Sequence, residues 1–196
     1  MSRRAVFLDR DGTLNVRPPE HRYVTSPKDF AWLPGAAEGA ARLAAAGYVL
    51  AVASNQRGVS LGVVEPAVLR AVEVRIQRDL GEHGCAIEAF GYCPHDVGAE
   101  CTCRKPRPGM ILRLARELDL DLRHSWVIGD SESDVLAGQA AGCRTALLGT
   151  VPDTCEPDLV APSLEAASEL VVREKSSLSR PVRHQRPRTP RRGRGT

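Results

Sequence analysis

The stretch AVFLDRDGTLN, residues 5–15, decides the fold of this chain. Four apolar residues, Ala5 to Leu8, stop at Asp9, and a second carboxylate, Asp11, follows two positions later. A short apolar run bounded by turn residues predicts a buried strand. Two carboxylates at the end of such a strand repel each other, and burying either of them is costly. The sequence therefore predicts that cations lie close to these two acids.

Further along the chain, apolar runs alternate with helical patterns. This alternation favours an α/β fold, a Rossmann-like open parallel sheet with helices on both faces. Expected strands cover residues 5–9, 48–55, 86–94, 125–130 and 145–150, with a short edge strand in 157–163. Expected helices cover residues 35–47, 65–84, 108–120, 133–142 and 164–172. The connecting segments are too short for a separate cap domain.

Chemically active residue types follow several of these strands. Asp9 comes after the first expected strand, and Asp130 ends the fourth. Ser54 and Asn55 end the second strand. Because ligands of open parallel sheets bind at the carboxyl ends of the strands, we expect one site at this edge of the sheet.

Charge is distributed unevenly along the 196 residues. Residues 173–196 hold nine Lys or Arg and one Glu, whereas residues 1–172 have a net charge of −5. This Pro- and Arg-rich tail is predicted to be disordered, after a single folded domain in residues 1–172. The tail is either a solubilising extension or a weak tether to nucleic acid or anionic lipid. It has no aromatic residue, which argues against a dedicated site for single-stranded nucleic acid.

Neither a membrane span nor an export signal is evident in the sequence. No apolar run approaches the ~20 residues that cross a bilayer. The N-terminal residues have no long apolar segment and no small-residue cleavage site. We therefore expect no membrane association and a cytoplasmic location, where six cysteines favour metal binding over disulfides.

Three of the cysteines and one histidine lie within eleven residues, in the stretch CPHDVGAECTC. These four candidate ligands are Cys93, His95, Cys101 and Cys103. Their number and type match tetrahedral Zn²⁺, and the protein fills all four positions, so we expect a structural zinc. The alternative is a set of free thiols beside an exposed histidine. The zinc-bearing loop leads directly to Arg104 and Lys105, which it would position.

Four motifs resemble those of the haloacid dehalogenase superfamily. FLDRDGTLN is similar to motif I, VASN to motif II, RKP to motif III and VIGDSESD to motif IV, in the family's order and over residues 3–170. The resemblance implies hydrolysis of a phosphate ester. It implies that Asp9 is the nucleophile that forms an aspartyl-phosphate and that Asp11 is the general acid and base. Lys105 would neutralise the attacking carboxylate and the phosphate.

Magnesium is the cofactor that this resemblance implies, and carboxylate and carbonyl oxygens suit it. Its ligands would be Asp9, Asp130 and the backbone carbonyl of Asp11. We expect Asp134 to support the metal shell or Lys105 rather than to bind Mg²⁺ directly. The structural alternatives are a strand-end turn for the first two acids and a helix N-cap for Asp130.

Phosphoryl oxygens would be held by Ser54 and by backbone amides near Asp11 and Asn55. Ser54 could instead be a simple turn residue. Gln56 and Arg57 are further candidate substrate contacts. These assignments place the substrate at the ends of the first two expected strands.

The zinc loop, together with DRDGTLN, NQ-x-G-V and GDS, resembles the heptose 1,7-bisphosphate 7-phosphatase family. This resemblance implies a small sugar bisphosphate as substrate, hydrolysed at its 7-phosphate. The stretch EHRYV is similar to the segment that the family uses near the sugar, although an arginine replaces the usual glycine. By this match the residues at the substrate entrance are Glu20, His21, Arg22 and Tyr23.

The second phosphate or the sugar hydroxyls would be bound by Arg104, since a guanidinium binds phosphate in a bidentate manner. A plain surface arginine is the alternative. The family often has an arginine where this chain has Leu61, which removes a positive charge.

Three other functions remain open. The histidinol-phosphate phosphatases share the zinc loop. A polynucleotide 3′-phosphatase would use the basic tail to hold nucleic acid. A zinc-bearing binding module without catalysis is disfavoured because all four catalytic positions are present: Asp9, Asp11, Lys105 and Asp130. We expect a monomer.

Overall fold

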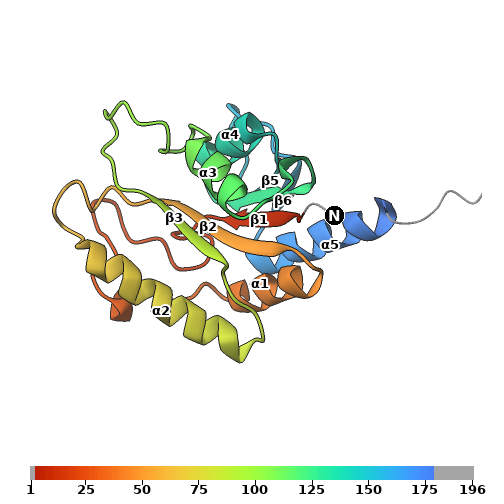
Figure 1. The fold of residues 1–196 in the computed structure, drawn as a ribbon, viewed down its shortest axis with the longest axis horizontal. Coiled ribbons are helices and arrows are strands. Elements are labelled where there is room, and N and C mark those ends of the chain that lie inside the picture. Colours follow the sequence, from red (N-terminus) through yellow and green to blue (C-terminus); the bar gives the residue numbers. More distant parts are fainter. Residues whose placement is uncertain (1–2, 179–196) are drawn as a thin grey trace, which may run out of the picture.

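A six-stranded parallel sheet forms the middle layer of the protein (Figure 1). The structure is a computed structural model that describes residues 3–178. The strand order is β3-β2-β1-β4-β5-β6, so the chain builds outward from the central β1 in one direction and then in the other. The strands are β1 (Ala5–Leu8), β2 (Val49–Asn55), β3 (Ala89–Cys93), β4 (Trp126–Gly129), β5 (Arg144–Leu148) and β6 (Leu159–Ala161).

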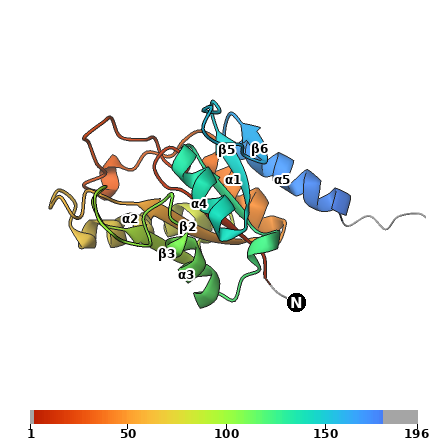
Figure 2. The same ribbon diagram turned by 90° about the horizontal axis from the view of Figure 1, so that it is seen from above.

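Helices cover both faces of the sheet (Figures 1 and 2). The helices are α1 (Ala36–Ala45), α2 (Pro66–Glu82), α3 (Gly109–Glu117), α4 (Glu132–Ala141) and α5 (Leu164–Leu178), with short 3₁₀ helices η1 (Pro27–Asp29) and η2 (Leu122–His124). One core lies between the sheet and α1, α2 and α5, and it includes Leu50, Val72 and Leu164. The other lies between the sheet and α3 and α4, and it includes Phe7 and Met110.

Burial on both faces explains why the strands are continuously apolar rather than alternating. All four residues of β1 are fully buried. Val6 and Leu8 face the α1 side, whereas Ala5 and Phe7 face the α3 side. The first chemically active residue, Asp9, therefore follows directly on a strand whose side chains are packed in both cores.

The predicted fold class is confirmed, with some shifts at the ends of elements. The third strand begins at Ala89, three residues later than expected. The last helix continues to Leu178, so the predicted domain boundary after residue 172 falls inside α5. The remainder of the predicted basic tail, residues 179–196, lies outside the described residues.

The long connections of the described chain carry little secondary structure of their own. Residues 9–35, between β1 and α1, contain only the 3₁₀ helix η1, and residues 56–65, between β2 and α2, contain no helix or strand. Neither segment forms the separate cap domain whose absence the sequence predicts. Within residues 3–178, no helix combines the length and the apolar character that crossing a membrane requires.

Candidate active site

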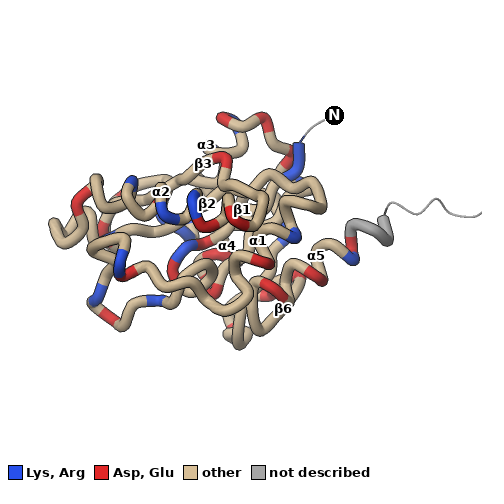
Figure 3. The backbone as a smooth tube through the Cα atoms, turned by 90° about the horizontal axis from the view of Figure 1, so that it is seen from below, with Lys and Arg blue, Asp and Glu red and all other residues tan. Residues whose placement is uncertain are grey.

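The candidate site lies where β1, β2 and β4 end. Asp9 is 7% exposed, and its backbone amide donates a hydrogen bond to the carbonyl of Ile128 at 3.0 Å. This bond extends the pairing of β1 with β4 by one residue and fixes the carboxylate at the strand end. In Figure 3, acidic and basic stretches meet near the labels of β1, β2 and α4.

Lys105 is the buried cation beside Asp9, the first of the two acids of motif I. Its Nζ donates to Asp9 Oδ1 at 2.8 Å, to the carbonyl of Ala53 at 2.6 Å and to Asp134. Burial alone would lower the pKa of Lys105, but the charges of Asp134 and Asp9 outweigh it and raise the pKa. The expected support of Lys105 by Asp134 is thus confirmed.

The same ion pair keeps Asp9 ionised. Burial acts to raise its pKa, but the charge of Lys105 and hydrogen bonds from Lys105 and Ser54 hold the pKa below the ordinary 3.8. An ionised carboxylate beside a buried ammonium is the arrangement that a nucleophilic aspartate needs.

Asn55 fixes the backbone of Lys105. Its side-chain Nδ2 donates to the Lys105 carbonyl, and its Oδ1 accepts from the Lys105 amide, both at 3.0 Å. One amide side chain therefore satisfies both polar groups of the residue that carries the ammonium. The sequence predicted Asn55 as a substrate contact, and the structure shows that its side chain also positions Lys105.

Asp11 accepts hydrogen bonds from three side chains. Arg10 makes contacts from Nε and Nη2 at 2.8 to 3.2 Å, Asn15 donates to Oδ1 at 2.9 Å, and Gln56 donates to Oδ2 at 2.9 Å. Arg10 is 1% exposed, so its charge is neutralised inside the protein by Asp11. The side chain expected to act as acid and base is therefore held in one orientation.

The residues expected to hold magnesium fit a hard cation. Asp9, Asp130 and Asp134 offer carboxylate oxygens that lie within 4.8 Å of one another. Asp134 accepts at both oxygens, from Lys105 at Oδ1 and from Ser131 Oγ at Oδ2 at 2.6 Å, whereas Lys105 contacts Asp9, and Arg17 contacts Asp130, through Oδ1. An all-oxygen donor set is the type that Mg²⁺ prefers.

Close packing fixes Asp130 beside the first motif. A Cβ placed on Gly12 would lie 1.7 Å from Asp130 Oδ2, so only a glycine fits there. Burial raises the pKa of Asp130 to about 6; Arg17 opposes this shift, and the charge of Asp9 adds to it. A nearby cation is what this carboxylate needs in order to ionise fully.

A cavity of about 290 Å³ lies at the strand ends. Its lining includes Asp9, Asp11, Ser54, Asn55, Gln56 and Lys105. Five basic side chains and two acidic ones contribute to the wall, which favours an anionic ligand. The basic side chains are Arg10, Arg17, Arg22, Arg57 and Lys105.

The loop after β1 brings only part of the predicted EHRYV segment to the cavity. Arg22 and Tyr23 line it. Glu20 and His21 lie outside the cavity that they were expected to line, and their side chains are 89% and 82% exposed. His21 has a φ of 61°, and the amide of Arg22 bonds to the carbonyl of Pro19 at 2.9 Å, so a tight turn directs these two residues into solvent.

Arg104 lies beside the main cavity rather than in its lining. It lines an adjoining hollow together with Asn55 and Lys105, and its Nη1 donates to the carbonyl of His95 at 3.2 Å. The structure thus places Arg104 where it joins the zinc loop to the site.

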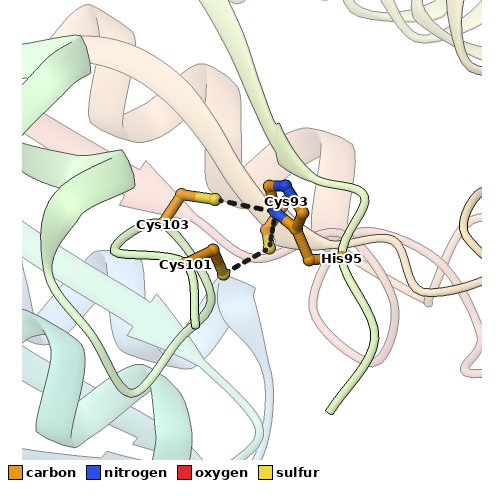
Figure 4. A group of neighbouring side chains, drawn as sticks. All are labelled: Cys93, His95, Cys101 and Cys103. Atoms are coloured by element: carbon orange, nitrogen blue, oxygen red, sulfur yellow. Dashed lines mark hydrogen bonds between the residues drawn. The ribbon is translucent and has the colours of Figure 1, made fainter. Parts of the chain in front are cut away.

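The four predicted zinc ligands converge, as Figure 4 shows. The sulfur or nitrogen atoms of Cys93, His95, Cys101 and Cys103 all lie within 4.8 Å of one another. Burial raises the pKa of Cys93 to about 12. Burial opposes ionisation of Cys101 as well, but hydrogen bonds from the Arg104 amide and from Cys103 lower its pKa to about 6. This soft donor set is compatible with zinc.

Comparison with known proteins agrees with the site. A family model described as HAD-hydrolase-like matches residues 102–167. Over 150 residues, the chain is 37% identical to the D-glycero-beta-D-manno-heptose-1,7-bisphosphate 7-phosphatase of Pseudomonas aeruginosa, with 76% of this chain and 83% of the relative covered. The chain belongs to the haloacid dehalogenase superfamily.

Other members of the haloacid dehalogenase superfamily extend this similarity. The enzyme of the same name from Rhodopseudomonas palustris is 41% identical over 147 residues, which cover 71% of this chain and 80% of that protein. The crystal structure of the D,D-heptose 1,7-bisphosphate phosphatase of B. bronchiseptica, complexed with magnesium and phosphate, has a TM-score of 0.78 and 33% identity. The match covers 87% of this chain and 99% of that one.

Because these similar proteins of the superfamily are named phosphatases, the protein is assigned to the same enzyme class, the phosphoric monoester hydrolases. The alternative of a zinc-bearing module without catalysis is therefore wrong. Two charged residues at the site were not predicted, namely Arg10 and Arg17. Arg10 was within reach of sequence reasoning, since it stands between the two acids of motif I. Arg17 belongs to none of the four motifs, so only the fold reveals it.

Proposed function

We propose that the protein is a Mg²⁺-dependent phosphatase that hydrolyses the 7-phosphate of D-glycero-beta-D-manno-heptose 1,7-bisphosphate. The observation that carries the chemistry is the buried contact between Lys105 and Asp9 at the ends of the central strands. The relatives of that name support the substrate, because they match three quarters of the chain at more than one third identity. We also propose that the protein works as a monomer.

In the first step, the Asp9 carboxylate attacks the phosphorus of the 7-phosphate. The bond from phosphorus to the sugar oxygen breaks, and an aspartyl-phosphate forms on Asp9. Asp11 transfers a proton to the leaving sugar oxygen. Lys105 offsets the charge that the carboxylate and the phosphate bring together.

In the second step, water hydrolyses the aspartyl-phosphate. Asp11, now ionised, takes a proton from that water as it attacks phosphorus, and the bond from phosphorus to Asp9 breaks. Inorganic phosphate leaves, and both side chains return to their starting states. Ser54, which is 1% exposed, and nearby backbone amides hold the phosphoryl oxygens during both steps.

Two metal ions complete the proposal. Asp9, Asp130 and the backbone carbonyl of Asp11 would hold Mg²⁺, which supplies positive charge to the phosphoryl oxygens when bound. A structural Zn²⁺ held by the Cys/His cluster would fix the loop that carries Arg104 and Lys105.

The test is a steady-state comparison of phosphate release with Mg²⁺ present. The substrates are both anomers of heptose 1,7-bisphosphate and histidinol phosphate, and Asp9→Asn is the control. We expect the highest kcat/KM for the beta anomer and no turnover by the variant. A preference for histidinol phosphate would overturn the proposed substrate while keeping the chemistry, and an active Asp9→Asn variant would overturn the chemistry.

A further inference from the structure

Not every arginine at the cavity is free to bind a ligand. Arg10 is buried and paired with Asp11. Arg57 forms an ion pair with Asp96 at 2.5 Å, on the zinc loop. Arg104 bonds to the carbonyl of His95 and lies outside the main lining. These three side chains therefore have structural partners that a substrate would have to displace.

Two other arginines of the cavity lining, Arg17 and Arg22, have N–H groups that are available to a ligand. Both residues lie on the loop after β1. Arg17 donates through Nη2 to Asp130 Oδ1 at 2.6 Å, and its side chain is 55% exposed. Its other N–H groups make no hydrogen bond with the described residues. Arg22 is exposed, lines the same cavity, and has no ion pair or hydrogen bond from its side chain within residues 3–178.

A turn and packing contacts of the loop after β1 hold Arg17 and Arg22 at the cavity. The turn from Pro19 to Arg22 reverses the chain between them. After the turn, Val24 is 2% exposed, and the ring of Tyr23 lies so close to Gly58 that a Cβ there would come within 2.9 Å of it. Before the turn, the amide of Val16 donates to the carbonyl of Ala31 at 2.8 Å, so both ends of the loop are anchored. The exposed tip carries Glu20 and His21 away from the cavity.

We propose that Arg17 and Arg22 bind the second phosphate of a bisphosphorylated substrate and give the enzyme its preference for bisphosphates over monophosphates. The proposal rests on the function proposed above. The reacting phosphate occupies the floor of the cavity at Asp9, Ser54 and Lys105. The far phosphate then meets the guanidinium groups of Arg17, which lies beside Asp130, and of Arg22, which lines the same cavity. Each can make charge-assisted, bidentate hydrogen bonds.

The experiment compares two substrates that differ only in the far phosphate, the heptose 1,7-bisphosphate and the same sugar with the 7-phosphate alone. The ratio of their kcat/KM values is measured at saturating Mg²⁺ for the wild type and for Arg17→Gln, Arg22→Gln and the double variant. We expect the ratio to fall about tenfold for each single change and further for the double, as the loss of a charged hydrogen bond predicts. Arg22→Lys should restore part of the ratio.

Arg113→Gln is the matched control, since Arg113 is an exposed residue of α3 that pairs with Glu117 on the same helix, away from the cavity lining. It should leave the ratio unchanged. A second readout is equilibrium binding of the bisphosphate to Asp9→Asn with and without Arg22→Gln, where we expect about tenfold weaker binding.

Three results would overturn the inference. The first is an unchanged ratio in both single variants, the second is an equal loss on both substrates, and the third is a fall caused by Arg104→Gln instead. Each leaves the proposed function standing, provided that the wild type prefers the bisphosphate. A wild type without that preference would overturn the proposed substrate and this inference together.

Discussion

Lys105 shows how one residue resolves the conflict between two buried acids. Its side chain is 3% exposed, and its ammonium contacts both Asp9 and Asp134, so one buried positive charge faces two carboxylates before any metal binds. A buried carboxylate without a cation would be costly, and the net charge that remains suits a divalent ion. The two hydrogen bonds between the Asn55 side chain and the backbone of Lys105 hold this residue in place.

Gly12 offers a test of how tightly the site is packed. Gly12→Ala should lower kcat at least about a hundredfold, because the new Cβ would displace the Asp130 carboxylate, and loss of a positioned electrostatic group costs that much. The measurement is phosphate release against Mg²⁺ concentration.

Gly142→Ala is the matched control for the backbone strain at Gly12. Gly142 also has a positive φ, 80°, but nothing lies within 4 Å of a Cβ there. This change should cost about 1 kcal/mol of stability and leave kcat intact. Equal activity in the two alanine variants would show that displacement of Asp130 is not what matters.

At the scale of elements, the loop between β3 and α3 joins the Cys/His cluster, the proposed zinc site, to Lys105. Residues 94–108 contain no helix or strand, yet they carry Lys105. Hydrogen bonds to backbone carbonyls stabilise the loop. The Arg107 side chain donates through Nη1 to the carbonyl of Ala99 at 3.0 Å, and the Gly109 amide donates to the carbonyl of Thr102 at 3.0 Å. The Cys/His cluster ties the start of the loop to its middle.

The double change Cys101→Ser and Cys103→Ser should remove the zinc and lower kcat at least about tenfold, since a small displacement of a catalytic group is costly. The loss should come from a looser loop rather than from lost chemistry, so limited proteolysis within residues 94–108 should become faster. Zinc content, kcat and proteolysis are the measurements.

Cys85→Ser is the control for the zinc loop, because Cys85 lies outside the cluster and should keep both zinc and activity. Unchanged kinetics in a zinc-free double variant would contradict a positioning role for the zinc.

At the scale of the whole molecule, one carboxylate joins the segment before α1 to α2. Trp32 Nε1 donates to Asp79 Oδ2 at 2.8 Å, and Arg78 contacts Oδ1 at 2.7 Å. Burial acts to raise the pKa of Asp79, but these contacts outweigh it and hold the pKa below 3.8. A carboxylate whose pKa is lowered by folding stabilises the protein above its unfolded pKa, and the gain is lost as the pH falls through the folded value.

Asp79→Asn should therefore lower the free energy of unfolding by about 1 to 2 kcal/mol at pH 7, and the difference from the wild type should shrink as the pH falls below 3.8. Denaturant unfolding at pH 7, 5 and 3 measures this. Glu117→Gln, in an exposed pair with Arg113, should change the free energy by less than about 0.5 kcal/mol. A difference that does not vary with pH would rule out the charge as its source.

The sequence predicted the fold well because buried parallel strands leave a strong signal. Runs such as Ala5–Leu8 are apolar throughout, and the polar residues at the ends of β1, β2 and β4 mark the edge of the sheet where the candidate site lies. Asp9 directly follows β1, and the Cys/His cluster begins at Cys93, the last residue of β3, so these positions follow from the strands.

The conformation of the loops could not be predicted from the sequence. Whether Glu20 or Arg22 faces the cavity depends on a turn with a positive φ at His21. Residues other than glycine seldom adopt this conformation, so the sequence does not predict the turn. The second role of Asn55 depends on a contact fifty residues away along the chain. No local pattern encodes such a contact.

The strand order has a consequence for the protein during its synthesis. The central strand β1 is made first, and its second neighbour, β4, begins only at Trp126. Until then, one edge of β1 lacks a partner, and an open apolar edge invites pairing with other chains. A ribosome must therefore deliver about two thirds of the polypeptide before this edge is closed, and Asp130 arrives only after that. A nascent or prematurely ended chain would be prone to aggregate and unable to act on phosphate esters.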